Sequence, residues 1–269
     1  MISKHSISFK SSWWFPLIAG IAISIQQIQV WACADEVNQP GAHNFTQGSL
    51  FHGHPVSSFQ INRPGYSLEY DASRRNPKWV FEHLSSEGLK GGADRSLFGF
   101  KEDESLPPHL RASLSDYRGS GFDRGHMAPA ADHRSSLDAM ADTFYLTNIC
   151  PQCPQFNRGF WAKFEKHVRD LTQYYKDICV ITGPLYLPYS DKDGKRYVKY
   201  EVIGQNDISV PTHFFKVITM KDWKGDQETM AYILPNAEIS QDTNFESFRT
   251  TVEKVERAAG IIFSKEGQK

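Results

Sequence analysis

The amino-acid sequence predicts an α+β fold in which a largely antiparallel β-sheet is flanked by helices. Short segments rich in β-branched and aromatic residues recur along the chain, separated by turn-like runs. Among them, residues 157–177 carry apolar side chains at three- and four-residue steps, which is typical of an amphipathic helix. With 269 residues, 40% of them hydrophobic, the chain is long enough to bury one substantial core.

Residues 1–34 resemble a secretory signal peptide rather than part of that core. Lys4 and Lys10 precede an apolar run over 13–25, and small residues follow at 32–34, as at a cleavage site. Three glutamines directly after the run keep it shorter than the ~20 residues that a membrane span needs. We therefore expect cleavage after residue 34, which leaves a secreted or periplasmic mature chain without a membrane span.

Two other destinations remain open for this N-terminal segment. A lipid-modified Cys33 would anchor the chain, although Trp31 is an unfavourable neighbour for such a site. A mitochondrial presequence would deliver the chain to the intermembrane space, although the segment lacks arginine.

After this segment we expect an irregular N-terminal arm over 35–64 and a single domain over 65–269. The arm contains several glycines and little periodicity, and no linker or internal repeat follows it. The domain opens with two alternating segments, 66–71 and 79–84, on either side of a turn, which predicts a hairpin.

The remaining elements follow from composition and periodicity. Residues 85–121 are rich in glycine and proline and are expected to be loops. A last helical segment, 244–260, has Gly260 as its stop signal. The segments with strand composition are 142–152, 178–187, 197–204, 210–220 and 230–236.

Charge and cysteine content exclude some functions and leave others open. The formal net charge is −1, so any nucleic-acid site has to be a local basic patch. Cys150 and Cys153 form an isolated CPQC pair with no second pair or HxxxH motif, and Cys179 leaves an odd number after cleavage. A loop disulfide or buried thiols are therefore favoured over a metal site.

The stretch FDRGHMAPAADHR, residues 122–134, carries the first candidates for chemistry. His126 can accept a proton from water near neutral pH, and Arg124 can offer a planar fork to a phosphate. In an extended segment, alternate side chains point to the same side. Arg124 and His126 would then face one substrate.

Asn157 and Glu165 are the second pair of candidates. They lie eight positions apart, about two helical turns, so their side chains project to roughly the same side. Amide and carboxylate oxygens suit a hard cation such as Mg²⁺, which keeps several waters and takes few protein ligands.

Each of these residues has an ordinary structural explanation when taken alone. A histidine after glycine is often a hydrogen-bonded loop residue, an asparagine before an apolar helix is often an N-cap, and Glu165 lies among lysines and arginine as on a solvated helix face. Only in combination do these residues indicate a catalytic site.

Several segments at this spacing resemble the DNA/RNA non-specific endonucleases with a ββα-metal finger, and the endonuclease G branch is the closer match. The motifs are DRGH followed by APAA, then FYLTN and NRGFW, and further segments agree in the same order: DYRGSGFDRGH, DTFYLTNICPQ, TGPLYLP, YVKYEVIG and VPTHFFKV. The resemblance covers about residues 65–265.

The resemblance implies roles for individual residues. His126 would be the general base, Asn157 the direct Mg²⁺ ligand, and Glu165 the residue that holds water on the metal. Arg124 and Arg134 would contact phosphate. By the same resemblance, Asn148 would support the geometry of the site, and an upstream arginine, either Arg95 or Arg111, would assist with the phosphate.

We therefore expect a Mg²⁺-dependent endonuclease, with Mn²⁺ as a substitute metal, that cleaves DNA and RNA without sequence preference. The resemblance implies products with 5′-phosphate and 3′-hydroxyl ends, and it makes a homodimer one expected state. The alternative is a nucleic-acid-binding or scavenging protein that has the fold without turnover. The sequence departs from the pattern at Arg158, where glutamine or asparagine often follows the ligand asparagine.

Overall fold

The computed structural model describes residues 59–263, which fall within one compact unit, Gly53–Lys269. The expected signal peptide over 1–34 lies outside the described residues, as do residues 35–58 of the expected arm. Within the described range, no helix combines the length and apolar character that a bilayer span requires. No disulfide links the three cysteines of this range, Cys150, Cys153 and Cys179.

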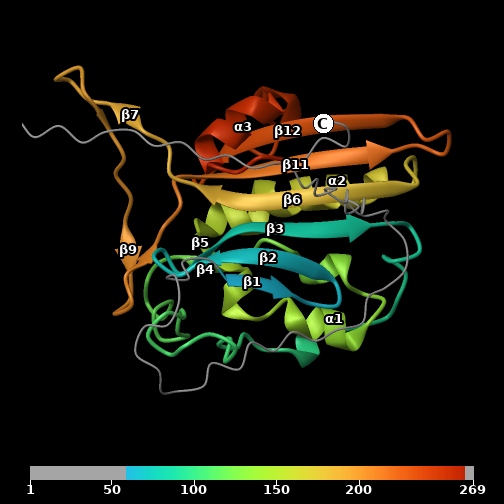
Figure 1. Ribbon diagram of the computed structural model, residues 1–269, viewed down its shortest axis with the longest axis horizontal. Helices are drawn as coiled ribbons and strands as arrows, with labels where there is room; N and C mark the ends of the chain where they lie inside the picture. Colours follow the sequence, from blue (N-terminus) through green and yellow to red (C-terminus); the bar gives the residue numbers. More distant parts are fainter. Residues whose placement is uncertain (1–58, 264–269) are drawn as a thin grey trace, which may run out of the picture. The chain divides into compact units, whose positions relative to one another are not determined.

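A seven-stranded antiparallel sheet forms the centre of the fold, which confirms the predicted α+β class (Figure 1). In spatial order its strands are β1 (Phe59–Asn62), β2 (Tyr66–Asp71), β3 (Asn76–Leu84), β6 (Asp177–Leu185), β11 (His213–Lys221), β12 (Gln227–Pro235) and β13 (Arg249–Thr250). Neighbouring strands are antiparallel throughout, and β2 and β3 form the predicted hairpin.

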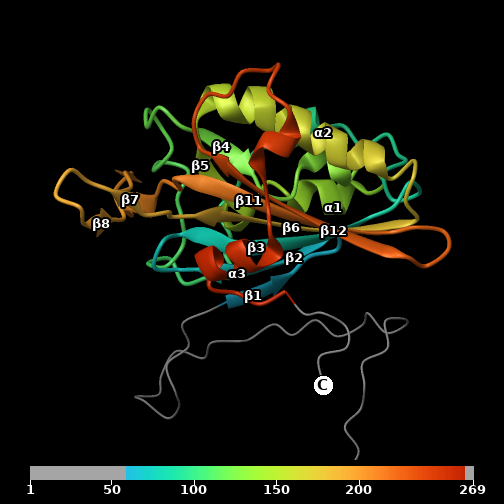
Figure 2. The ribbon, with the colours of Figure 1, turned by 90° about the horizontal axis from the view of Figure 1, so that it is seen from above.

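Different helices cover the two faces of this sheet. Figure 2 shows α2 (Ala162–Leu171), α1 (Leu137–Asp142) and the β4–β5 pair on one face and α3 (Val252–Ala259) on the other. A hydrophobic core lies on each face, and strand β11 contributes side chains to both. Phe214 and Ile218 pack on the α2 side, and Phe215 and Val217 pack on the α3 side. This follows from the alternation of side chains along a strand.

Helix α3 ends where the sequence predicts. Gly260 adopts φ 65°, ψ 36° and its N–H donates to the carbonyl of Glu256, which closes the helix with a left-handed residue.

Five segments differ from the sequence prediction. The end of the expected irregular arm, 59–62, is strand β1, because Phe59 and Ile61 alternate with polar residues and pack against the core next to β2. The expected helix over 157–177 is split into a wide helical turn, η4 (Phe156–Trp161), and α2, because Gly159 has the non-helical angles φ −107°, ψ −106°.

The third difference is the segment 197–204, which the sequence predicts as one strand. Instead, the segment takes part in two short strand pairs that lie outside the main sheet. In one, β7 (Tyr189–Ser190) pairs with β8 (Arg196–Tyr197); in the other, β9 (Val202–Ile203) pairs with β10 (Ile208–Ser209). Figure 1 shows β7 and β9 in a projection that leaves the main sheet. Most of its side chains have no sheet to pack on and remain exposed, whereas Ile203 is buried in a smaller core with Ile208.

The two remaining differences lie at 142–152 and 244–260. The expected strand over 142–152 is a strand only in β5 (Ile149–Gln152); before it, Leu146–Asn148 form a 3-10 turn, in which the Asn148 side chain bonds back to the carbonyl of Thr143. The expected helix over 244–260 is interrupted by β13, because Arg249 and Thr250 pair with β12; α3 begins only after Thr251, whose side chain caps it.

Candidate active site

The chemistry-bearing residues lie on two short strands and the helical segment that follows them. Strand β4 (Asp123–His126) pairs with β5 (Ile149–Gln152), with His126 opposite Ile149 and Asp123 opposite Gln152. The chain then enters η4 and α2, which lie against the same side of the main sheet. This strand–strand–helix unit brings residues 123–126 and 157–165 to one place.

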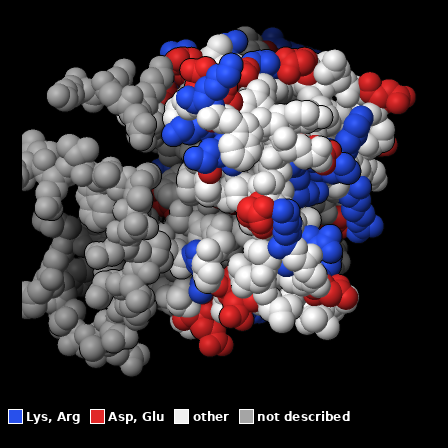
Figure 3. Space-filling model, turned by 90° about the vertical axis from the view of Figure 1, so that its right-hand side faces the viewer, with Lys and Arg blue, Asp and Glu red and all other residues white. Residues whose placement is uncertain are grey.

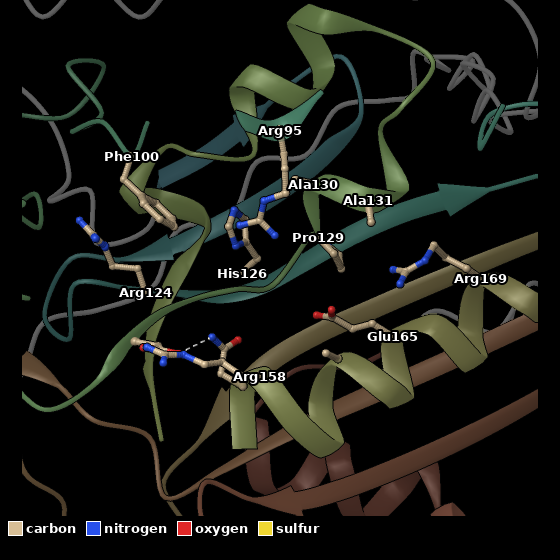
Figure 4. Close-up of a pocket in the computed structure, with 13 residues that line it drawn as sticks. Arg95, Phe100, Arg124, His126, Pro129, Ala130, Ala131, Arg158, Glu165 and Arg169 are labelled. Atoms are coloured by element: carbon tan, nitrogen blue, oxygen red, sulfur yellow. Dashed lines mark hydrogen bonds and ion pairs between the residues drawn. The ribbon is translucent and has the colours of Figure 1, made fainter. Parts of the chain in front are cut away.

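A pocket of about 440 Å³ lies between this strand pair and the helix (Figure 4). It contains four of the predicted site residues, Arg124, His126, Asn157 and Glu165. Its full lining is Arg95, Phe100, Asp123, Arg124, His126, Pro129, Ala130, Ala131, Asn157, Arg158, Ala162, Glu165 and Arg169.

His126 lies against an aromatic wall of this pocket. Its ring centre is 5.2 Å from that of Phe100 and 5.1 Å from that of Phe144, the latter edge-on. Burial, and secondarily the positive charge of Arg95, lower the pKa of His126 from 6.5 to about 3. The imidazole is therefore neutral at physiological pH, the state in which a base can accept a proton.

Asn148 fixes the backbone directly after His126. This fully buried amide accepts a hydrogen bond from the Ala128 N–H at 2.9 Å and donates to the carbonyls of Ala128 and Thr143, both at 2.9 Å. Three bonds satisfy most of what an amide side chain can make, so the loop after β4 has one defined path. Asn148 does not line the pocket; its contacts are those of a residue that supports the site's geometry.

Asn157 is not an N-cap, because it lies inside η4 and its side chain bonds across to β4. Its Nδ2 donates to Oδ2 of Asp123 at 2.9 Å, which leaves the amide oxygen Oδ1 for the pocket. Arg158 binds the same carboxylate through two bonds. The pKa of Asp123 is low although burial alone would raise it, since Arg158 and Asn157 both stabilise the anion.

Glu165 lies at the edge of a group of buried charges rather than on a solvated helix face. Burial raises the pKa of Glu165 to about 8, against the opposing effect of Lys216, a 2% exposed lysine on β11. Deeper in the group, Asp132 accepts a bond from Arg169 at 2.7 Å, and burial raises the pKa of Asp132 to about 6. The carboxyl group of Glu165 is therefore protonated at neutral pH unless a cation joins it.

The arginines divide into those inside and those outside the pocket. Arg124 lies 4.6 Å above the Phe100 ring on the same side of β4 as His126, as the alternation predicts. Of the two upstream candidates, Arg95 lines the pocket beside His126 (Figure 4), whereas Arg111 pairs with Glu102 at 3.6 Å. Arg134, a predicted phosphate contact, is exposed and does not line the pocket.

Sequence reasoning did not single out Asp123 or Arg169. Asp123 is the first letter of the DRGH motif, so its position beside His126 was a signal that could have found it. Arg169 is four residues after Glu165, one helical turn further along the same face, and helical periodicity alone would place it there.

The donor atoms of the pocket suit a hard cation that keeps most of its waters. Within residues 59–263, no three His, Cys, Asp or Glu side chains lie together in a way that would hold a metal ion. The pocket instead offers the free amide oxygen of Asn157, with the carboxyl groups of Asp123 and Glu165 in the same lining. One direct oxygen ligand with acids in reach of water fits Mg²⁺ or Mn²⁺ better than Zn²⁺.

Comparison with known proteins agrees with this arrangement. The profile of the DNA/RNA non-specific endonuclease family matches residues 50–269. The chain is 48% identical to bovine (Bos taurus) mitochondrial endonuclease G over 202 residues, which are 75% of this chain and 68% of that protein. It is 45% identical to the mitochondrial nuclease of Saccharomyces cerevisiae over 216 residues, 77% of this chain and 65% of that protein.

A solved structure shows the same fold. The crystal structure of an EndoG/EndoGI complex superposes with a TM-score of 0.76 at 47% identity, covering 78% of this chain and 87% of that chain. The family is one of metal-dependent nucleases, so the chain is an enzyme that hydrolyses nucleic acid rather than a binding protein without turnover. The chain belongs to the DNA/RNA non-specific endonuclease family, as its resemblance to the endonuclease G branch predicted.

Proposed function

We propose that the chain is a Mg²⁺-dependent, sugar-non-specific endonuclease that cuts DNA and RNA and leaves 5′-phosphate and 3′-hydroxyl ends. The main support for this proposal is that four groups line the same pocket: a neutral His126, the amide oxygen of Asn157, and the side chains of Arg95 and Arg124. A base, a cation ligand and phosphate-binding groups are the parts that phosphodiester hydrolysis requires.

In this mechanism, His126 removes a proton from a water molecule as its oxygen attacks phosphorus. The P–O bond to the 3′ oxygen then breaks, and that oxygen leaves and takes up a proton from solvent water. Arg95 and Arg124 hold the phosphate in line and offset its charge. Asn157 would bind Mg²⁺ and Glu165 would orient water there; the cation, when bound, stabilises the charge that builds on the phosphate. Asn148 keeps His126 in place through the loop after β4.

The nicking of a supercoiled plasmid tests this function. Wild-type protein should nick the plasmid with Mg²⁺ and not with EDTA, and His126→Ala should be inactive at equal protein. His83→Ala is the matched control, because His83 is 53% exposed, pairs with Asp177 and lies outside the pocket. Products that DNA ligase rejoins without prior kinase treatment support 5′-phosphate ends; EDTA-resistant nicking contradicts the proposal.

The substrate surface is expected to be local and positive. Figure 3 shows basic and acidic side chains interspersed on one face, and the net charge is −1, so no uniform positive field covers the molecule. The basic residues near the motif are Arg118, Arg124, Arg134, Arg158 and Lys163. Backbone binding by such a patch is sequence-independent.

We also propose a homodimer, formed through the projection over residues 186–204. Its side chains Tyr197, Val198, Tyr200 and Val202 are 39–50% exposed, an unusual run of large apolar groups for a monomer surface. Tyr200→Lys should shift the mass measured by light scattering from dimer to monomer. Trp223→Lys, a change at a 72% exposed residue outside the projection, should leave the mass unchanged.

The destination of the chain is a separate proposal. We propose export with removal of residues 1–34; the names of the mitochondrial relatives support the alternative, import to the intermembrane space. The N-terminal residue of the native protein, together with the compartment from which it is recovered, separates the two. Recovery from mitochondria contradicts export.

A further inference from the structure

Arg158 occupies a position at which the sequence departs from the family pattern, and its contacts give it a specific partner. Its Nε donates to Oδ2 of Asp123 at 2.8 Å and its Nη2 to Oδ1 at 2.5 Å. The arginine side chain is 73% exposed, whereas the aspartate side chain is only 15% exposed. A planar fork that binds both oxygens holds a carboxylate in one orientation, which a single ammonium or amide group does not.

The carboxylate that Arg158 holds is also the one that orients Asn157. Asp123 Oδ2 accepts from Nδ2 of Asn157 at 2.9 Å, so one oxygen is shared by the two donors. The two ends of an amide side chain have nearly the same shape but opposite hydrogen-bonding character, and only the oxygen can bind a cation. The bond to Asp123 therefore decides which end of Asn157 is left for the pocket.

Both side chains that bind the Asp123 carboxylate come from the start of the helical segment. Residues 157 and 158 are consecutive in η4, yet both side chains reach Asp123 on β4. Figure 4 shows Arg158 on the helix side of the pocket, across from His126 and Arg95. The pair therefore acts on the ligand side of the site and leaves the base untouched.

We propose that Arg158 is a positioning residue for metal binding: by clamping the Asp123 carboxylate, it keeps the Asn157 oxygen turned into the pocket. The inference rests on the proposed role of Asn157 as metal ligand. Because Arg158 also carries a positive charge, the clamp and simple charge repulsion predict opposite changes in the affinity for a divalent cation when Arg158 is replaced. Coulomb repulsion alone predicts that removal of this charge tightens the binding of a divalent cation. The clamp predicts that binding weakens.

The test is the affinity of the full chain for Mn²⁺, measured by calorimetry or electron paramagnetic resonance without nucleic acid. Arg158→Gln should weaken Mn²⁺ binding about tenfold, the lower end of the ~10–100-fold effect of residues that hold metal ligands in place. Its thermal unfolding should match wild type, because the side chain is largely exposed. Lys163→Gln is the matched control: it removes one charge from the same helical segment, from a lysine that bonds to the carbonyl of Gln241 and not to Asp123.

Two further variants separate the possible failures. In an Asp123→Asn background, Arg158→Gln should cause little further loss, because the carboxylate through which it acts is gone. An equal loss in both backgrounds overturns the clamp, and so does an Arg158→Gln variant that binds Mn²⁺ as tightly as wild type or more tightly. If Asn157→Ala itself binds Mn²⁺ normally, the proposed ligand is wrong and the clamp falls with it.

Discussion

The two walls of the pocket hold their half-buried titratable groups in opposite surroundings. On the β4 wall, His126 lies among Phe100 and Phe144, and the charge with the largest effect on its pKa is that of an arginine, Arg95. On the α2 wall, Glu165 shares a region with Asp132, Arg169 and Lys216, where carboxylates and cations alternate.

Burial shifts the pKa of a base and the pKa of an acid in opposite directions. Loss of solvent disfavours the charged form of either group, so the pKa of His126 falls to about 3 and that of Glu165 rises to about 8. The first shift keeps a proton acceptor free over a wide pH range. The second keeps a carboxyl group neutral until a cation offsets the cost of ionising it.

The largest expected effect is on the β4 wall. His126→Ala should lower kcat by about 10²–10⁴-fold, because it removes the group that accepts the proton, while the affinity for Mg²⁺ stays near that of wild type. Steady-state plasmid cleavage and a metal titration measure the two quantities. Loss of Mg²⁺ affinity in this variant would show that His126 is a ligand instead of a base.

The next effect is on the opposite wall. Asn157→Ala should weaken Mg²⁺ binding, so that its rate at low metal is strongly reduced and partly recovers as the Mg²⁺ concentration rises. His126→Ala should show no such recovery. The measurement is rate against Mg²⁺ concentration for both variants; equal recovery in both would remove the distinction between the walls.

The two walls should also give the metal-free protein opposite dependences of stability on pH. For His126, whose folded pKa is lowered, the contribution is present above pH 6.5 and lost as pH falls toward about 3. For Glu165, whose folded pKa is raised from 4.5, the contribution is present below pH 4.5 and lost as pH rises toward about 8.

Unfolding midpoints in EDTA across pH 4–8 test these windows. Glu165→Gln should lose the part of the slope that lowers stability between pH 4.5 and 8. His126→Ala should lose the part that lowers stability as pH falls below 6.5. If neither substitution changes its own window, burial does not control these groups.

The smallest expected effects concern phosphate contacts. Arg95→Ala, inside the pocket, should reduce kcat/KM more than Arg134→Ala, outside it. Each lost contact should also lower the salt dependence of substrate binding by about one log unit per log of salt. A larger effect of Arg134→Ala on the rate would restore the role that the family resemblance implies for it.

Much of the fold could be predicted from local patterns. The β2–β3 hairpin, strands β6, β11 and β12 and the stop of α3 at Gly260 follow from alternation, composition and turn residues, all of which are properties of neighbouring positions. The 197–204 segment shows the limit: its alternation is that of a strand, but alternation does not say whether a sheet is there to receive it.

The candidate site, like the fold, could be predicted from the sequence only in part. The sequence by itself determined that Arg124, His126, Asn157 and Glu165 are of the right type and spacing, because the motif and the helix period are local. Only the tertiary structure decided that Arg95 enters the pocket and Arg111 does not, that Asn157 bonds to Asp123, and that Glu165 is a half-buried acid next to Lys216. These facts depend on which distant segments exclude water from each group, and burial is a property of the packed chain rather than of its sequence order.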